Sequence, residues 1–148
     1  MVALAENRKS KFDFEILETF EAGIELFGFE VKAIQAHRMS MEGSYIFPKK
    51  GEVWLIGATI APYQSNNTPK DYNLMRDRKL LLHKAEIGIL IGAFSTKGLT
   101  ILPIKVYNKG RKIKLELGIA KKRKTHDKRS HIKEREDKRK IERTLKEI

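Results

Sequence analysis

The feature that most constrains the fold is a strict alternation of apolar and polar residues late in the chain. Every second position from 113 to 119 is apolar, namely Ile113, Leu115, Leu117 and Ile119. Because successive side chains of a β-strand point to opposite faces, this spacing predicts a strand with one buried face. A second apolar run covers 99–107 and shifts phase near Leu102–Pro103, which indicates a bulge or an edge position. The residues Asn108–Gly110 between the two runs predict a hairpin turn.

Similar patterns upstream indicate a mainly β chain. A long first strand is expected from Phe12 to Leu26, and strands at 45–47 and 53–60 flank a turn at Pro48–Gly51. Apolar residues at helical spacing predict a helix over His83–Ser95. A shorter helix is expected over 29–37 and a long loop over 61–77. Together these elements fit a mainly β fold with embedded helices, and best a small closed β-barrel of the oligonucleotide-binding (OB) type.

The charge of the chain is uneven. Its net charge is +12, and the 28 residues from Lys121 onward carry 13 Lys and Arg against 6 Asp and Glu. We therefore expect two parts, a barrel domain at 1–120 and a basic tail at 121–148. The tail has too few apolar residues to offset its ordering entropy, yet opposite charges recur four residues apart, as in Glu134–Lys138. We expect it to be disordered when free and helical when bound, and the alternative is a solvated charged helix without a partner.

Candidate catalytic chemistry is sparse. The chain has no cysteine, its four histidines lack the spacing of a metal site, and no phosphate-binding glycine loop or nucleophile elbow occurs. Glu15, Glu18, Glu21 and Glu25 alternate with other residues as the solvated face of a strand would, and we interpret Gly23 as a turn residue. We therefore expect no enzymatic activity, no cofactor and no metal.

The same composition indicates where the protein works and what it binds. No apolar stretch is long enough to span a membrane, and the first ten residues lack the apolar run of a secretory signal, so the cytoplasm is the expected location. The positive charge predicts a polyanionic partner. Tyr63, Tyr72 and Tyr107 are the few candidate stacking residues, which favours a folded RNA recognised by shape and backbone.

Several short segments resemble one known family in order and spacing. They are Asn7–Lys9, Phe20–Ile24, Gly28–Lys32, Ser44–Tyr45, Gly51–Leu55, Arg78–Lys84, Lys97–Thr100, His126–Arg129 and Ile132–Arg135. Together they resemble the SsrA-binding protein (SmpB) family over about residues 7–146. The combination of RKLLLHK with DKRxxIKER is specific to that resemblance. One departure is Lys122, which stands where the family commonly has a glycine.

The resemblance implies a bacterial RNA-binding protein with an OB-type barrel. Such a protein binds the tRNA-like domain of transfer-messenger RNA and delivers it to stalled ribosomes for trans-translation. Its tail enters the empty mRNA path near the decoding centre of the small subunit, where it contacts ribosomal RNA and becomes helical. A monomer is expected. The alternatives are a structural ribosomal protein and a general RNA-binding OB-barrel protein.

The resemblance and the charge pattern together indicate two sets of functional residues. The RNA-binding set is Asn7, Arg8, Lys9, Glu21, Leu81, Lys114, Lys121, Lys122, Arg123 and Lys124. The last four are expected to contact phosphates because they are consecutive cations where the chain leaves the barrel, and the alternative for them is a generic basic hinge. The ribosome-binding set in the tail is His126, Asp127, Lys128, Arg129, Ile132, Lys133 and Arg135. Without the resemblance, Glu21 would be a solvated turn residue, Leu81 a core residue at a helix start, and Lys114 an idle surface lysine.

Overall fold

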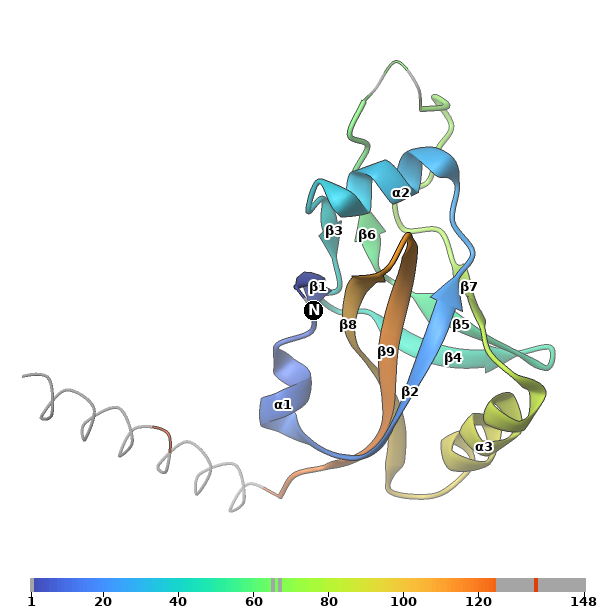
Figure 1. Cartoon of the computed structure of the whole chain (residues 1–148). Helices are drawn as coiled ribbons and strands as arrows, with labels where there is room; N and C mark the ends of the chain where they lie inside the picture. The colour runs from blue at the N-terminus through green and yellow to red at the C-terminus, as the bar shows by residue number, and fades with distance from the viewer. Residues whose placement is uncertain (1, 65, 67, 125–134, 136–148) are drawn as a thin grey trace, which may run out of the picture.

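The computed structural model describes residues 2–64, 66, 68–124 and 135 (Figure 1). The described residues form an antiparallel sheet of seven strands in the order β1-β8-β9-β2-β7-β5-β4, and a separate ladder of β3 with β6. The strands of the main sheet are β1 (Ala3–Glu6), β2 (Phe14–Ile24), β4 (Tyr45–Lys49), β5 (Glu52–Ile56), β7 (Arg78–Leu81), β8 (Leu99–Lys109) and β9 (Lys112–Lys122). The short ladder joins β3 (Met39–Ser40) and β6 (Thr59–Ile60). The prediction of a mainly β fold is confirmed.

The centre of the sheet is the hairpin predicted from alternation. The four alternating residues of β9 are all buried, and β8 pairs with β9 along its whole length. The turn lies at Gly110–Arg111, slightly later than predicted, and Gly110 has the positive φ (62°) that such a tight turn requires. The predicted bulge is also present, because the β8–β9 register shifts between Pro103 and Lys105.

Three helices occur in the described residues: α1 (Lys9–Asp13), α2 (Gly28–Gln35) and α3 (Lys84–Phe94). The helices predicted at 83–95 and 29–37 correspond to α3 and α2. Helix α3 begins after His83, whose backbone N–H donates to Glu86 Oε1 at 3.1 Å. Helix α1 was not predicted. It includes Phe12 and Asp13, so the strand predicted to start at Phe12 begins instead at Phe14.

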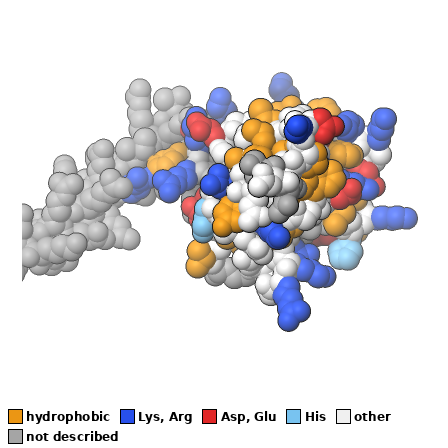
Figure 2. Space-filling view, turned by 90° about the horizontal axis from the view of Figure 1, so that it is seen from above, with side chains coloured by type: hydrophobic (Ala, Val, Ile, Leu, Met, Phe, Trp, Pro, Cys, Tyr) orange, Lys and Arg blue, Asp and Glu red, His pale blue; other side chains and the backbone are white. Residues whose placement is uncertain are grey.

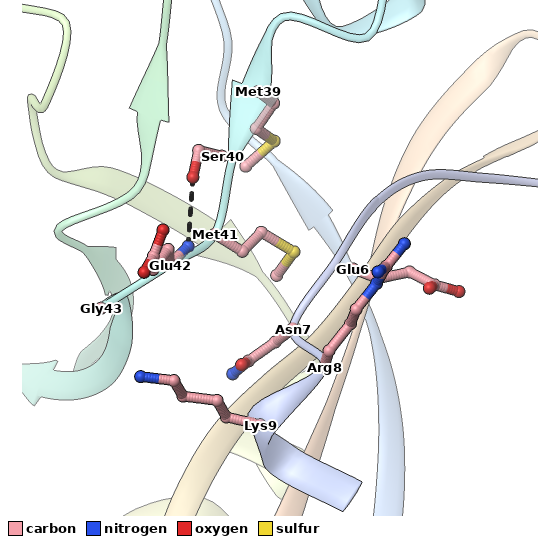
Figure 3. Close-up of a pocket in the computed structure, with 9 residues that line it drawn as sticks. All are labelled: Glu6, Asn7, Arg8, Lys9, Met39, Ser40, Met41, Glu42 and Gly43. Atoms are coloured by element: carbon pink, nitrogen blue, oxygen red, sulfur yellow. Dashed lines mark hydrogen bonds between the residues drawn. The ribbon is translucent and has the colours of Figure 1, made fainter.

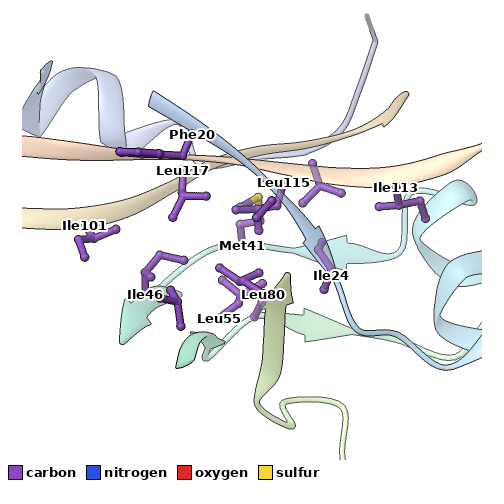
Figure 4. Close-up of a cluster of buried hydrophobic side chains, with 14 of the residues drawn as sticks. Phe20, Ile24, Met41, Ile46, Leu55, Leu80, Ile101, Ile113, Leu115 and Leu117 are labelled. Carbon is purple, nitrogen blue, oxygen red and sulfur yellow. The ribbon is translucent and has the colours of Figure 1, made fainter. Parts of the chain in front are cut away.

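The buried face of the curled sheet encloses the core (Figure 4). Side chains from the central strands meet those of the β4–β5 hairpin, and Met41 fills the space beside them. The fully enclosed apolar residues include Ile34, Met41, Val53, Leu55, Leu80, Leu90, Val106, Leu115 and Leu117. Since α2 and α3 contribute Ile34 and Leu90, both helices are fastened to the same core.

The predicted closure of the barrel is not found. Within the described residues, no hydrogen-bonded ladder joins the edge strands β1 and β4. Helix α3 instead packs against both β4 and β8, and β3 packs against β1. Side-chain packing from these elements therefore covers the core where a closed barrel would have main-chain pairing.

A buried ion pair ties together segments that are distant in sequence. Glu30 on α2 and Arg78 on β7 are both fully buried, with Arg78 Nη2 2.7 Å from Glu30 Oε2. Arg78 Nη1 also donates to the Ala58 carbonyl at 2.7 Å, and Arg78 Nη2 to the Leu74 carbonyl at 3.0 Å. The same carboxylate accepts hydrogen bonds from Tyr72 and Arg76, so the end of the predicted 61–77 loop is held against α2.

Hydrogen bonding decides the ionisation of this network. Burial disfavours the charged form of Glu30, but hydrogen bonds from Arg76, the Phe27 backbone, Tyr72 and Arg78 outweigh it and lower the pKa of Glu30 to about 2. Burial and the hydrogen bond to Glu30 raise the pKa of Tyr72 to about 12. The carboxylate is therefore ionised and the tyrosine hydroxyl remains a donor across the physiological range.

Replacing Arg78 by methionine tests how much the Glu30–Arg78 pair contributes to the stability of the fold. Arg78→Met removes the fully buried partner of Glu30 and leaves only Arg76 and Tyr72 to compensate its charge, so we expect a loss of about 3 kcal/mol in the free energy of unfolding, measured by urea denaturation. The control is Asp77→Asn, which breaks the exposed Lys49–Asp77 pair (3.2 Å) and should cost less than about 1 kcal/mol. Equal effects of the two substitutions would contradict this assignment.

The pH dependence of stability should carry the signature of Glu30. The pKa of Glu30 is lowered in the folded state. Its contribution to the free energy of unfolding is therefore complete above 4.5, the pKa of the unfolded chain, and is lost as the pH falls towards about 2. Urea denaturation of the wild type and of Glu30→Gln between pH 2 and 7 measures this. We expect the difference in unfolding free energy between the two proteins to shrink over that interval. Parallel stability curves would disprove the role of Glu30.

Candidate RNA-binding surface

Three of the residues predicted to bind RNA line one groove on the outer face of the sheet. The groove has a volume of about 630 Å³ and includes Glu21 from β2, Leu81 from β7 and Lys114 from β9. The remaining lining residues come from β5, β7 and the start of α3: Glu52, Lys79, Leu80, Leu82, His83, Lys84, Glu86 and Ile87. Segments separated by up to 93 positions in the chain thus form one surface.

Strand register brings these residues together. Gly23 pairs with Leu81 on one side and with Lys114 on the other. Cross-strand partners project to the same face, so Leu81 and Lys114 flank Gly23. A Cβ on Gly23 would lie 3.2 Å from Leu81 Cβ, which is tighter than ordinary packing. Gly23 therefore lies within β2 and not in a turn as predicted, and its missing side chain leaves room for Leu81.

The structure shows which leucine of the Leu80–Leu82 run faces outward. Leu80 is fully buried and Leu82 is half-buried, whereas Leu81 is 51% exposed. The alternative that Leu81 is a core residue is therefore wrong. Its apolar side chain, among charged neighbours, offers the groove a contact that does not depend on charge.

Glu21 is a fixed, ionised acceptor in this groove. The Tyr107 hydroxyl donates to Glu21 Oε2, and Lys109 Nζ donates to Glu21 Oε1 at 2.9 Å. Those two hydrogen bonds, together with the positive charges of Lys109 and Lys114, lower the pKa of Glu21 below 4.5. Burial and the bond to Glu21 raise the pKa of Tyr107, so its hydroxyl remains a donor. The carboxylate is thus oriented and keeps lone pairs that can accept from base amino groups.

The role of Tyr107 and Lys109 in positioning the Glu21 carboxylate was not predicted from the sequence. Tyr107 was one of the candidate stacking residues, but it is only 4% exposed and its hydroxyl holds Glu21 instead. Tyr72 is likewise occupied by the Glu30 network, whereas Tyr63 is half exposed. A signal for Tyr107 was available, because it ends the apolar run that forms β8.

The Asn7–Lys9 segment lies at a different pocket. This pocket has a volume of about 370 Å³, and Figure 3 shows the segment facing Met39–Gly43 across it. Arg8 and Lys9 are exposed, but the Asn7 side chain donates to the Pro103 carbonyl at 2.9 Å and its backbone N–H donates to Ile104 O at 2.8 Å. Asn7 therefore holds the β8 bulge.

The four cations at 121–124 form a third location, at the end of β9. Lys121 and Lys122 still pair with β2, so the strand continues two residues past the boundary expected near 120. Lys121, Lys122 and Lys124 are exposed, and Arg123 is half-buried with its backbone N–H donating to Asp13 O at 2.9 Å. Eight positions of strand separate Lys114 from Lys122, roughly 26 Å at the usual rise.

Of the tail residues predicted to bind the ribosome, only Arg135 is described. Its guanidinium lies 4.6 Å from the centre of the Phe12 ring. The other six, His126, Asp127, Lys128, Arg129, Ile132 and Lys133, lie outside the described residues. The same holds for the predicted change of the tail from disorder to helix.

Charge is distributed around the body. Figure 2 shows Lys and Arg side chains projecting at many points of its rim, with fewer Asp and Glu between them.

In the part of the chain that the structure describes, no group of three or more His, Cys, Asp or Glu could hold a metal ion. No helix among the described residues combines the length and apolar character needed to cross a membrane.

Comparison with known proteins points to one family. A family model described as SmpB protein matches residues 4–147. The SsrA-binding protein of Thermosynechococcus vestitus is 45% identical over 144 residues, covering 97% of this chain and 95% of that protein. The SsrA-binding protein of Acetivibrio thermocellus is 49% identical over 144 residues, with 97% and 93% covered.

A solved structure is similar as well. It is described as "tmRNA-SmpB: a journey to the center of the bacterial ribosome", and a chain in it matches with a TM-score of 0.67 and 43% identity, covering 81% of this chain and 84% of that one. The sequence match is nearly full-length, and the fold is shared at the same level of identity. The chain therefore belongs to the SmpB family of SsrA-binding proteins.

Proposed function

We propose that this protein binds the tRNA-like domain of transfer-messenger RNA and acts with it on stalled ribosomes in trans-translation. The observation that carries the proposal is family membership over residues 4–147, with relatives named for SsrA binding at 45–49% identity. A solved relative described with tmRNA and the bacterial ribosome supports the same partners. Translation takes place in the cytoplasm, so this is the compartment we propose. The protein acts as an adaptor without catalysis of its own.

The body at 1–120 acts as an OB-type RNA-binding domain in this proposal. Its curled sheet, with α3 packed against β4 and β8, supports the barrel-like shape without requiring closure by hydrogen bonds. The outer groove is the recognition site. Glu21 accepts hydrogen bonds from bases, Leu81 packs against a sugar or base, and Lys114 neutralises a phosphate.

The other predicted residues extend the contact. Arg8 and Lys9 are exposed beside the pocket of Figure 3, where they can reach backbone phosphates while Asn7 keeps the segment in place. Lys121, Lys122, Arg123 and Lys124, the first four residues of the tail, continue the positive charge beyond the body. The tail at 121–148 then serves the ribosome, with His126, Asp127, Lys128, Arg129, Ile132, Lys133 and Arg135 placed near the decoding centre and mRNA path.

Substitutions in the groove should weaken binding in two distinguishable ways. Glu21→Gln and Leu81→Ala should each cost about 1–3 kcal/mol of binding free energy for the tRNA-like domain, because they remove specific contacts. Lys114→Met should lower the dependence of log K on log salt by about 0.9, the share of one phosphate contact on a duplex. Filter binding at several salt concentrations measures both.

The controls for this experiment are one variant and two RNAs. Lys97→Met removes an exposed lysine outside the groove and should reduce affinity far less than Lys114→Met. An ordinary tRNA and an unstructured RNA of equal length test selectivity. Equal binding of the wild type to all three RNAs, with equal losses for both lysine variants, would mean a nonspecific polycation and would overturn the proposal.

Truncation after Lys124 should separate the two activities. This end point keeps all of β9 and its pairing with β2, so the body should fold. We expect the truncated protein to retain most of its affinity for the tRNA-like domain but to lose tagging activity in a reconstituted translation reaction with truncated mRNA. The full-length variant with Ile132→Ala and Lys133→Ala is the matched control and should show the same separation. Loss of RNA affinity with retained tagging would refute the assigned roles.

A further inference from the structure

A second exposed feature lies beside the groove, on the β4–β5 hairpin. Phe47 and Trp54 are direct cross-strand partners, so their rings share the outer face, and Tyr45 joins them two positions along β4. Phe94, at the end of α3, packs edge-to-face against Phe47 with ring centroids 5.3 Å apart. Tyr45, Phe47 and Phe94 are 39–49% exposed. We call Tyr45, Phe47, Trp54 and Phe94 the aromatic strip.

The aromatic strip is continuous with the groove. Trp54 pairs with Phe47 on β4 and with Lys79 on β7. Lys79 itself lines the groove with Leu81, and its Nζ lies 3.7 Å from the Glu52 carboxylate. Because cross-strand partners share a face, Phe47, Trp54 and Lys79 lead without interruption from the edge of the sheet to the groove.

Positive charge accompanies the rings. Lys49 Nζ lies 4.6 Å from the centre of the Trp54 ring, and the indole N–H donates to the Lys49 carbonyl at 3.4 Å. These two contacts hold the indole in place with the Lys49 cation over its ring, and the same Nζ lies 3.2 Å from Asp77 Oδ2. Lys50, in the hairpin turn, is also exposed. Aromatic rings interleaved with lysines are the chemistry that stacks unpaired bases and neutralises their phosphates.

We propose that the aromatic strip stacks at least one unpaired base of the RNA whose neighbouring nucleotides occupy the groove. Trp54 and Phe47 supply the stacking surface, and Lys49 and Lys79 lie where flanking phosphates would pass. The proposal rests on the proposed function, because the RNA must first be bound in the groove. It adds a site that reads single-stranded nucleotides to a groove that recognises a folded RNA.

Trp54 reports directly on this site because it is the only tryptophan of the chain. We expect titration of the full-length protein with the tRNA-like domain to quench Trp54 fluorescence and to protect the indole from acrylamide. Filter binding under the same conditions gives the affinity independently. The fluorescence change should saturate at the RNA concentration at which binding saturates.

Variants distinguish stacking from a structural effect. Trp54→Leu and Phe47→Leu keep an apolar side chain but remove the ring, and each should weaken binding about tenfold, within the range for one lost base stack. Trp54→Phe should restore most of the affinity. Ile89→Ala is the control: Ile89 is 48% exposed on α3, outside both the strip and the groove, and this variant should bind as the wild type does. Thermal unfolding by circular dichroism verifies that each variant folds.

The outcomes separate this proposal from the proposed function. The wild type could bind the RNA tightly without a change in Trp54 fluorescence, and folded Trp54→Leu and Phe47→Leu could bind with unchanged affinity. That result would overturn the proposal for the aromatic strip alone. Protection of Trp54 by ribosomes lacking transfer-messenger RNA, but not by the RNA, would also overturn it and assign the strip to a ribosomal contact. Failure of the wild type to bind the tRNA-like domain would overturn both proposals.

Discussion

The Glu30–Arg78 ion pair is the interaction on which the functional surface depends. Arg78 is the first residue of β7, and its buried guanidinium is satisfied only when this side chain points inward. Alternation along the strand then places Leu80 in the core and turns Lys79 and Leu81 outward. A slip of one residue would bury Leu81 and expose Arg78, which would take from Glu30 the only fully buried cation that pairs with it in the described part of the chain. The pair therefore sets the face on which the groove forms.

The outer face combines attraction with discrimination. A basic surface alone would bind any polyanion, and its affinity would fall steeply with salt. Glu21 works against simple attraction, yet Tyr107 and Lys109 hold its carboxylate ionised and oriented. A fixed acceptor beside Lys114 can prefer one arrangement of base donors and phosphate over others. In the proposed function, the Glu21 carboxylate repels phosphates in general but rewards an RNA that presents base donors to it, and selectivity arises from this difference.

The open edge of the sheet extends the proposed RNA-binding surface beyond the groove. In a closed barrel, β4 would pair with β1, whereas here the hairpin of β4 and β5 stands at an edge with its aromatic side chains exposed. Pro48 has no N–H to donate, and Lys49 places a charge on the same strand, two features that discourage pairing with another chain. The edge is thereby protected while Phe47 and Trp54 remain accessible beside the groove.

The sequence by itself determined the elements whose signals are local. The alternation in β9 and the phase shift at the β8 bulge were visible in the residues, as were the helical spacing of α3 and the concentration of charge after Lys121. The family resemblance named Glu21, Leu81 and Lys114 as RNA-binding residues, which remains a proposal. The two-residue strand β3 and the four-residue strands β1 and β7 were not predicted, because strands this short show too little alternation.

Only the tertiary structure decided that Leu81 faces outward, that Gly23 makes room for it and that Tyr107 is buried against Glu21. The tertiary structure also decided that the sheet does not close into a barrel. The sequence could not show these features, because strand pairing and register depend on residues far apart in the chain.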